Sequence, residues 1–371
     1  MKKLLFTAKN LKIGGMEKAL VVLLNSLVDN YKITLILEEK IGVLEDQLDD
    51  RIKVREYKIS NFKISFIRKI INFSKRVLWL LHNYHCYDFS CCYATYSIIG
   101  SKLALIGSKN SSLYVHSNYY GYFNGQKEKI NDFFESLSYK KFKNLIFVSN
   151  ESKNQIQDVI SYNKKHLLVI NNLTDYKSIV DGTLERSDLS MFSQDNINLL
   201  FVGRLDNTSK NFDLLLDSFS LVKNKRIKLF ILGDGYYKEN IMNKIEELDL
   251  NDRVELLGER INPYPYMKYC DALIITSRYE GFPLIYNEAL VLNKKVITTV
   301  PVSDSFIDIK DYFSCVNATK EDISNAIDAL NKEKVNYFMS FDKINEANLR
   351  KLITVIESDG ECENEERKTN D

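Results

Sequence analysis

Residues 198–222 read NLLFVGRLDNTSKNFDLLLDSFSLV, and this stretch decides the fold. Its first part, Asn198–Val202, is a short apolar run of the kind that forms a buried strand. Apolar residues then recur at helical spacing over Asn211–Val222, after a turn that contains Gly203. The stretch therefore predicts a β-strand that leads directly into an α-helix.

The same alternation of strand and helix extends along almost the whole chain. We expect further helices at Met16–Val28, Ile64–His82 and Lys238–Leu248. The other expected strands are Lys3–Ala8, Lys32–Leu37, Ile52–Arg55, Asp88–Tyr93, Ser112–His116, Asn144–Val148, Leu167–Ile170, Lys228–Leu232, Val254–Leu257, Ala272–Thr276 and Val296–Thr299. Such alternation requires crossover connections and gives parallel, doubly wound sheets. The predicted class is α/β, with two Rossmann-like domains facing each other across a cleft.

The chain has 371 residues, which at roughly 150 residues per domain corresponds to two domains and a tail. We expect an N-terminal domain at 1–172, a polar linker at 173–197 and a second domain at 198–340. A helix at 341–357 is expected to return to the first domain. The acidic, polar tail at 358–371 is expected to be disordered.

Composition excludes several classes of protein. The 51 Lys and Arg residues balance 50 Asp and Glu residues, which argues against a dedicated nucleic-acid binder. The six cysteines form no C-x-x-C pair, so we expect reduced thiols in a cytoplasmic protein. No apolar run approaches the roughly 18 residues needed to span a bilayer. We therefore expect a cytoplasmic protein that is either soluble or peripheral at the inner face of the cell membrane.

Two cations lie where the strand of residues 198–202 gives way to its helix. Arg204 and Lys210 flank the turn, and helix N-termini offer unpaired N–H groups to anions. This combination suits a diphosphate, although a solvated surface loop would look the same. The chain contains neither a G-x-x-x-x-G-K-[ST] loop nor a D-x-D motif, so we expect no metal site.

The most informative segment, residues 277–288, reads SRYEGFPLIYNE. Glu280 follows a predicted strand, Gly281 allows a turn, and Pro283 suits the first position of a helix. Glu288 would lie about one turn into that helix, with its side chain tilted back toward the N-terminus. We expect both carboxylates to face one pocket, where they could accept hydrogen bonds from sugar and ribose hydroxyls.

Together these motifs resemble the family 4 retaining glycosyltransferases of the GT-B type, and in particular the bacterial cell-envelope, capsule and O-antigen group. The resemblance is carried by G-R-L…K, G-D-G, N-P-Y-P-Y and E-G-F-P within an E-x(7)-E element. It is dense from Leu199 to Val300 and thinner in the N-terminal half.

The resemblance implies roles for individual residues. Arg204 and Lys210 would hold the donor diphosphate, Glu280 would contact the transferred sugar, and Glu288 would contact the nucleotide ribose. The remaining donor-binding positions are Gly15, Arg260, Gly281, Phe282, Pro283 and Leu284. Those expected to take part in catalysis are Glu280, His116, Lys210 and Arg204.

His116 ends a predicted strand of the N-terminal half. A histidine in such a position can donate a hydrogen bond to a sugar hydroxyl or to an oxygen that gains negative charge. A purely structural histidine is the alternative, and the family resemblance favours the functional role.

The implied reaction moves a sugar from a nucleotide diphosphate, expected to be UDP-hexose or UDP-N-acetylhexosamine, to a hydroxyl of a lipid-linked glycan or surface polysaccharide. It would retain the anomeric configuration and need no cofactor beyond the nucleotide sugar. The alternatives are a GT-B sugar-nucleotide epimerase, a phosphorylase with lysine-bound pyridoxal, or a non-catalytic sugar-nucleotide-binding subunit.

The stretch Arg51–Trp79 combines basic and aromatic residues. From Arg51 to Arg76 it contains nine basic residues and a single acid, Glu56. This pattern is typical of a segment that contacts an anionic membrane surface, or of a solvated helix face over the domain core.

Overall fold

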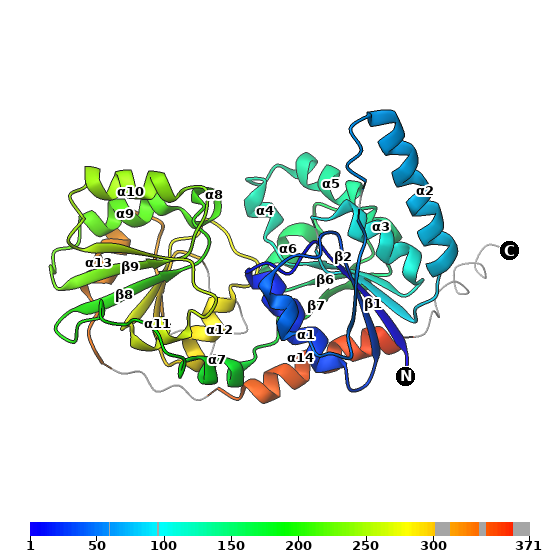
Figure 1. Cartoon of the computed structure of the whole chain (residues 1–371). Coiled ribbons are helices and arrows are strands. Elements are labelled where there is room, and N and C mark those ends of the chain that lie inside the picture. Colours follow the sequence, from blue (N-terminus) through cyan, green and yellow to red (C-terminus); the bar gives the residue numbers. More distant parts are fainter. Residues whose placement is uncertain (59, 95, 301–311, 334–338, 359–371) are drawn as a thin grey trace. The chain divides into compact units, whose positions relative to one another are not determined.

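The computed structural model describes residues 1–58, 60–94, 96–300, 312–333 and 339–358. These residues form two compact units (Figure 1). The N-terminal unit comprises Met1–Leu173 together with the segment that begins at Asp342, and the C-terminal unit comprises Thr174–Phe341.

The N-terminal unit is built on a seven-stranded sheet in the order β3-β2-β1-β4-β5-β6-β7. All neighbouring strands pair in parallel. The strands are β1 (Lys3–Ala8), β2 (Lys32–Leu37), β3 (Lys53–Glu56), β4 (Phe89–Cys92), β5 (Ser111–Val115), β6 (Asn144–Phe147) and β7 (Leu167–Val169). The helices are α1 (Gly15–Leu27), α2 (Ser65–Asn83), α3 (Ile98–Gly107), α4 (Tyr119–Tyr122), α5 (Lys127–Ser136), α6 (Asn150–Gln157) and α14 (Phe341–Glu357).

The C-terminal unit repeats this plan with a six-stranded parallel sheet in the order β10-β9-β8-β11-β12-β13. Helices α9 and α10 lie on one face of this sheet and α11 and α12 on the other (Figure 1). The strands are β8 (Ile197–Val202), β9 (Ile227–Leu232), β10 (Val254–Gly258), β11 (Ala272–Ile275), β12 (Lys295–Thr298) and β13 (Phe313–Cys315). The helices are α7 (Tyr176–Gly182), α8 (Asn207–Lys210), α9 (Phe212–Ser220), α10 (Lys238–Glu247), α11 (Tyr264–Tyr269), α12 (Leu284–Val291) and α13 (Lys320–Asp328).

Residues 198–222 contribute much of the C-terminal core. Leu199 and Phe201 of β8 are fully buried in one cluster with Phe212, Leu215 and Phe219 of α9. The rings of Phe201 and Phe212 lie 4.7 Å apart at a tilted angle. Burying an apolar side chain of this size is worth roughly 1.5–3 kcal/mol, so the strand and helix hold each other in place.

Each sheet has a topological switch point, where the strand order reverses. In the N-terminal unit the switch lies between β1 and β4, and in the C-terminal unit it lies between β8 and β11. Ligands of doubly wound sheets bind at the carboxyl ends of the strands at this point. The loops that follow β8 and β11 therefore carry the residues of greatest interest.

The α/β class and the two doubly wound parallel sheets are confirmed, and each predicted strand matches an observed one to within one residue at either end. The helix predicted from Asn211 differs at its start. Asn211 has left-handed backbone angles (φ 57°, ψ 52°) and separates α9 from the additional short helix α8. The strand β13 was not predicted, because three residues carry too little pattern.

The predicted linker at 173–197 contains the helix α7, which is capped by Asp175 and lies within the C-terminal unit from Thr174 onward. The helix α14 packs within the N-terminal unit through contacts at its C-terminal end. Glu357 pairs with Lys2 at 2.7 Å, and Asn110 donates a hydrogen bond to the Val355 carbonyl. The predicted tail lies outside the described residues, apart from Ser358. Among the helices that the structure describes, none combines the length and the apolar character needed to cross a membrane.

Candidate functional site

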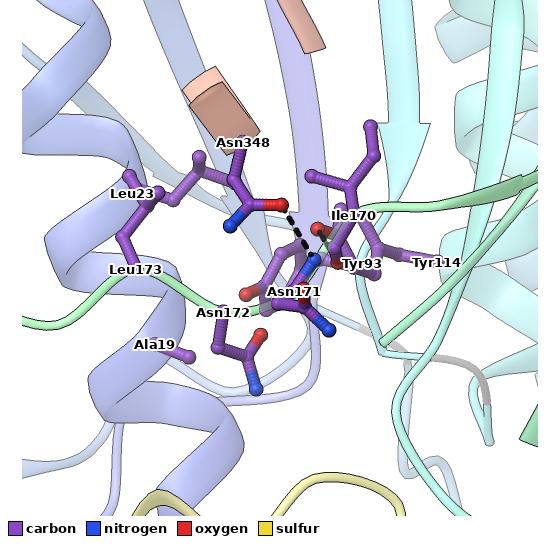
Figure 2. A pocket seen from close by; sticks show the side chains of 9 residues that line it. All are labelled: Ala19, Leu23, Tyr93, Tyr114, Ile170, Asn171, Asn172, Leu173 and Asn348. Atoms are coloured by element: carbon purple, nitrogen blue, oxygen red, sulfur yellow. Dashed lines mark hydrogen bonds between the residues drawn. The ribbon is translucent and has the colours of Figure 1, made fainter. Parts of the chain in front are cut away.

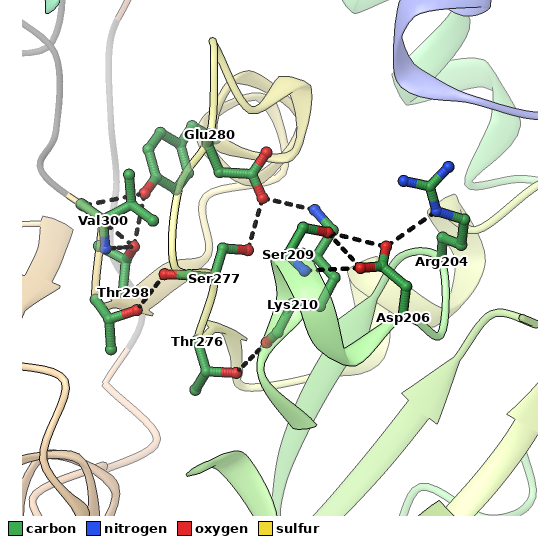
Figure 3. A network of polar contacts seen from close by, with 11 residues as sticks. Arg204, Asp206, Ser209, Lys210, Thr276, Ser277, Glu280, Thr298 and Val300 are labelled. Atoms are coloured by element: carbon green, nitrogen blue, oxygen red, sulfur yellow. Dashed lines mark hydrogen bonds and ion pairs between the residues drawn. The ribbon is translucent and has the colours of Figure 1, made fainter. Parts of the chain in front are cut away.

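An ion pair between Lys210 and Glu280 joins the loops that follow β8 and β11. The Lys210 Nζ lies 2.6 Å from the Glu280 Oε1, and both side chains are mostly buried (Figure 3). The Ser277 hydroxyl donates a second hydrogen bond to the same oxygen, also at 2.6 Å. These two contacts fix one carboxylate oxygen of Glu280 and hold the Lys210 ammonium group against it, at the switch point of the sheet.

Main-chain contacts between the same loops hold this ion pair in place. The Thr276 hydroxyl donates to the Lys210 carbonyl at 2.9 Å, and the Arg278 N–H donates to the Ser209 carbonyl at 2.8 Å. The loops meet because β8 and β11 are neighbours, with Leu200 opposite Leu273. Lys210 and Glu280, which are 70 positions apart in the sequence, are thus brought together by the topology of the sheet.

A second ion pair positions Arg204. The Arg204 Nε lies 3.0 Å from the Asp206 Oδ2, and 74% of the Arg204 side chain is exposed. Among the described residues its two Nη groups make no hydrogen bond. Arg204 is therefore held at Nε while its terminal amino groups remain available to an anion.

Asp206 is buried and caps the short helix α8. Its Oδ1 accepts hydrogen bonds from the Ser209 N–H at 2.8 Å and from the Ser209 hydroxyl at 2.7 Å. Burial by itself would raise the pKa of Asp206, but the bonds from Ser209 and Arg204 outweigh it, so this pKa lies below its usual value. Asp206 thus remains a carboxylate and supports both the helix and Arg204.

The backbones of the loops that follow β8, β9 and β10 pack closely against one another. The Gly233 N–H donates to the Gly258 carbonyl at 3.0 Å, and the Leu205 N–H donates to the Asp234 carbonyl at 2.9 Å. Gly233 has a φ of 151°, and a Cβ there would collide with the Gly203 carbonyl oxygen. Only glycine satisfies both constraints, so the G-D-G turn is required by backbone packing.

The second carboxylate of the E-x(7)-E element has a different partner. The Glu288 Oε1 accepts a hydrogen bond from the Tyr264 hydroxyl at 3.2 Å, and Glu288 is buried on α12. Burial and the neighbouring Glu288 carboxylate raise the pKa of Tyr264, so this hydroxyl remains a donor at neutral pH. Among the described residues, Glu280 and Glu288 belong to separate hydrogen-bond networks. That both carboxylates face one pocket stays a prediction.

Helix α12 begins one residue later than predicted. Pro283 is the residue before the helix rather than its first residue, with extended backbone angles (φ −68°, ψ 113°). Proline offers no capping side chain, so no side chain caps the N-terminus of α12. Gly281 and the buried Phe282 lead into this N-terminus, and Leu284 is its first residue.

Arg260 follows β10 and contacts a neighbouring aromatic ring. Its Nε donates to the Tyr266 hydroxyl at 3.1 Å, and its guanidinium lies 5.9 Å from the centre of that ring. The side chain is exposed. The role expected for Arg260 at a nucleotide base stays a prediction.

His116 belongs to the N-terminal unit and follows β5 directly. Its ring lies 4.1 Å from the ring of Tyr93 and is stacked at 4.7 Å on that of Tyr114. The Nε2 is buried, with no hydrogen-bond partner among the described residues. Burial lowers the pKa of His116 to about 3, so the imidazole is neutral at pH 7.

The two tyrosines that contact His116 have a further role in the N-terminal unit. Tyr93 and Tyr114 also line a small pocket with Asn171 and Asn348, where the Asn171 N–H donates to the Asn348 Oδ1 at 3.2 Å (Figure 2). This pocket has room for about one water molecule and is too small for a sugar.

Gly15 is the first residue of α1. No side chain caps the N-terminus of α1, and the same holds for α12.

The structure therefore brings the loops of Arg204, Lys210 and Glu280 together, while Glu288 and Arg260 have other partners in the same unit. Asp206, Ser277 and Tyr264 were not singled out from the sequence. Asp206 carries a usable signal, since Asp is one of the residues preferred at a helix N-cap. Ser277 lies three residues before its partner Glu280, but this spacing does not show that the two side chains meet. Tyr264 carries no signal, because its partner Glu288 lies 24 residues away.

Comparison with known proteins places these observations in a family context. Residues 187–347 match the family model described as "Glycosyl transferases group 1". The chain is 34% identical over 173 residues, 46% of its length and 45% of the relative's, to an N-acetylgalactosamine-N,N'-diacetylbacillosaminyl-diphospho-undecaprenol 4-alpha-N-acetylgalactosaminyltransferase of Campylobacter jejuni. It is 30% identical over 145 residues, 39% of its length and 40% of the relative's, to the amylovoran biosynthesis glycosyltransferase AmsD of Erwinia amylovora. The chain thus spans less than half the length of these relatives.

Solved structures resemble nearly the whole chain. HepE of Anabaena, crystallised with UDP-glucose, has a TM-score of 0.69 at 17% identity, covering 95% of this chain and 100% of that one. A TarM variant of S. aureus in complex with UDP has a TM-score of 0.71 at 16% identity, covering 96% and 100%. These neighbours confirm the GT-B fold, and the family match confirms the resemblance to group 1 glycosyltransferases over residues 187–347. The retaining mechanism stays a prediction.

Proposed function

We propose that this chain, whose residues 187–347 carry a group 1 glycosyltransferase domain, is a retaining glycosyltransferase of cell-envelope biosynthesis. It would move a sugar from a nucleotide diphosphate to a hydroxyl of a lipid-linked glycan or surface polysaccharide. The observation that carries the proposal is the Lys210–Glu280 pair, at 2.6 Å, beside the exposed guanidinium of Arg204. This arrangement places two cations and a carboxylate at the switch point of the sheet.

The two cations suit the diphosphate of the donor. The ammonium group of Lys210 has three donors, of which one is directed to Glu280. The terminal amino groups of Arg204 can form a paired contact with phosphate oxygens. The uncapped N-terminus of α12 adds backbone N–H groups and the positive end of a helix dipole on the same loop as Glu280. We infer that these groups replace a divalent metal.

Glu280 is suited to contact the transferred sugar. Its Oε1 is occupied by Lys210 and Ser277, whereas its Oε2 has no hydrogen-bond partner among the described residues. A carboxylate oxygen accepts hydrogen bonds from sugar hydroxyls, and the fixed Oε1 prevents the group from rotating away. Glu280 would therefore position the sugar ring relative to the diphosphate.

The reaction breaks the bond between the anomeric carbon and the diphosphate oxygen and forms a bond from that carbon to the acceptor oxygen. The acceptor proton passes to the departing diphosphate on the same face, which retains the anomeric configuration. Arg204 and Lys210 would stabilise the negative charge on the leaving group, a contribution worth roughly 2.7–4 kcal/mol per well-placed donor. His116, being neutral, would act as a hydrogen-bonding group and not as a proton donor.

Similar proteins support the choice of substrates. HepE was crystallised with UDP-glucose and the TarM variant with UDP, and the Campylobacter relative is an N-acetylgalactosaminyltransferase that acts on a glycan linked to undecaprenol diphosphate. We infer a UDP-hexose or UDP-N-acetylhexosamine donor and a lipid-linked acceptor. From such an acceptor we infer a cytoplasmic enzyme that acts at the inner face of the cell membrane.

A screen of nucleotide sugars tests this function. UDP-glucose, UDP-N-acetylglucosamine and UDP-N-acetylgalactosamine should raise the melting temperature by mass action, and at least one should do so more than GDP-mannose. The Lys210→Ala variant should lose this shift, and EDTA should leave it unchanged. The best donor is then incubated with lipid-linked acceptors, and NMR should show a product with the donor's anomeric configuration. An isomerised sugar released without acceptor would instead indicate an epimerase.

A further inference from the structure

Helix α2 of the N-terminal unit has an apolar face that points into solvent. Phe66, Phe73 and Leu81 are 72%, 65% and 69% exposed. Together with Ile70 and Val77, they follow one side of the helix at spacings of three, four and seven residues. A surface helix of a soluble protein normally turns such a face toward the core, so α2 has the opposite orientation.

Polar contacts attach the other side of α2 to the unit. The Asn72 Oδ1 accepts a hydrogen bond from the Ser60 N–H at 2.8 Å, and the Lys75 Nζ donates to the Lys58 carbonyl at 2.7 Å. Trp79 packs its edge against the ring of Tyr57 at 5.9 Å. In Figure 1, α2 lies on the outside of the unit, next to α3. The helix is therefore docked through its more polar side, which leaves the apolar side outward.

The charges around this face favour one kind of partner. Residues 57–87 contain six Lys and Arg and no Asp or Glu, although the whole chain has almost equal numbers of both signs. Arg68 and Lys69 are exposed and form no ion pair among the described residues. A second copy of the chain would bring two such basic segments together, whereas an anionic lipid surface complements them.

We propose that α2 lies in the interface of an anionic membrane, with its axis along the membrane surface. Phe66, Phe73 and Leu81 enter the boundary of the acyl chains, and the exposed Arg68 and Lys69 contact lipid phosphates. The sequence places this contact over Arg51–Trp79. The structure moves it toward the helix, since Arg51 is already paired with Asp29 and Asp49 at 2.9 and 2.8 Å. The proposal deepens the proposed function by identifying the surface that would meet a lipid-linked acceptor.

Vesicle flotation of the full chain tests the surface. We expect binding to vesicles of equal parts phosphatidylglycerol and phosphatidylcholine, and much weaker binding to phosphatidylcholine alone. The Phe66→Ser/Phe73→Ser/Leu81→Ser variant should lose at least about tenfold in binding, because each apolar side chain contributes to partitioning. A matched control replaces exposed apolar residues of the other unit, Leu184→Ser/Tyr236→Ser/Met242→Ser, and should bind like the wild type. Equal binding by both triple variants, or no binding by the wild type, would overturn the proposal.

The chain's single tryptophan tests the orientation of the helix. Native Trp79 faces the unit, so brominated lipids should quench its fluorescence weakly. The Phe73→Trp/Trp79→Phe variant moves the fluorophore to the outward face, and its emission should shift to the blue and be quenched several-fold more strongly. Equal quenching at both positions would overturn the proposed orientation. Sedimentation that shows a wild-type dimer and a monomeric triple serine variant would assign the face to a second copy instead.

Donor binding separates this proposal from the proposed function. The triple serine variant should keep the stabilisation by the preferred UDP-sugar, because α2 contains none of the donor residues. A chain that binds UDP-sugars but no vesicles contradicts only the membrane surface. A chain that binds vesicles through α2 but no nucleotide sugar contradicts only the glycosyltransferase assignment.

Discussion

The carboxyl edges of the two sheets are built from different chemistry. In the C-terminal unit, the loops after β8 and β11 hold two ion pairs, Lys210–Glu280 and Arg204–Asp206. In the N-terminal unit, the loop after β5 presents a neutral His116 between two tyrosine rings. The strand order around the switch points is the same, so the difference arises from the side chains placed on a common frame.

This contrast shows that the same strand order can carry side chains of different chemistry in the two units. Fixed charges suit the stabilisation of a leaving diphosphate, and neutral polar or aromatic groups suit the contact with sugar rings. The comparison leads to four predictions about which residues act through charge.

The largest effect is expected at the charged edge, by which we mean the C-terminal loops that hold the Lys210–Glu280 and Arg204–Asp206 ion pairs. Lys210→Ala and Glu280→Ala should each lower the turnover of the preferred UDP-sugar by on the order of 100-fold or more, since each removes a group that the proposed function assigns to the diphosphate or the sugar. Turnover is measured as UDP release, and circular dichroism checks the fold. Lys225→Ala, an exposed lysine of the same unit, is the control. Near-normal turnover in either site variant would remove the charged edge from the mechanism.

A smaller effect is expected at the neutral edge, by which we mean the loop after β5 that holds His116. His116→Ala should lower kcat/KM by about tenfold, an order of magnitude expected for the loss of one hydrogen-bonding group. His116→Gln should recover part of it, because an amide can also donate. Since His116 is neutral above a pKa of about 3, the pH profile between 6 and 8 should be the same in the wild type and in His116→Gln. A wild-type titration near 6.5 that is absent from this variant would show that His116 acts through charge.

Stability gives a second measure of the same residue. The folded-state pKa of His116 is lowered to about 3 from an ordinary value of about 6.5. Between these values the unfolded chain binds more protons, so the free energy of unfolding falls as pH drops from about 6.5 toward 3. Urea unfolding at pH 7.5 and pH 5 should show this loss, and it should be smaller in His116→Gln.

The smallest effect is expected at Asp206, which caps α8 and pairs with Arg204. Asp206→Ala should cost about 1–2 kcal/mol of stability by removing the cap of α8, whereas Asp206→Asn keeps a good capping residue and should cost less. The folded-state pKa of Asp206 is lowered, so its contribution is present at neutral pH and lost as pH falls below about 4. Thermal unfolding at pH 7 and pH 3 should therefore show a difference between the wild type and Asp206→Ala that shrinks at pH 3. A constant difference would assign the effect to packing.

The strands and most helices could be predicted because their signals are local. The apolar run of β8 and the helical spacing of α9 lie within a few residues of each other, and both are buried in one core. The break at Asn211 could not be predicted, since left-handed backbone angles at one asparagine leave the hydrophobic spacing unchanged. The extended angles of Pro283 are hidden in the same way, because proline fixes φ alone.

The sequence by itself determined the α/β class, the βα rhythm and the residue types of the donor site, because these depend on neighbours along the chain. Only the tertiary structure decided that Lys210 meets Glu280, because that contact depends on β8 lying next to β11. It also decided that α2 turns its apolar face outward, since a helical pattern shows that two faces differ but not which one docks. Contacts between distant segments follow from how the sheets and helices pack, and that packing minimises the free energy of the whole unit.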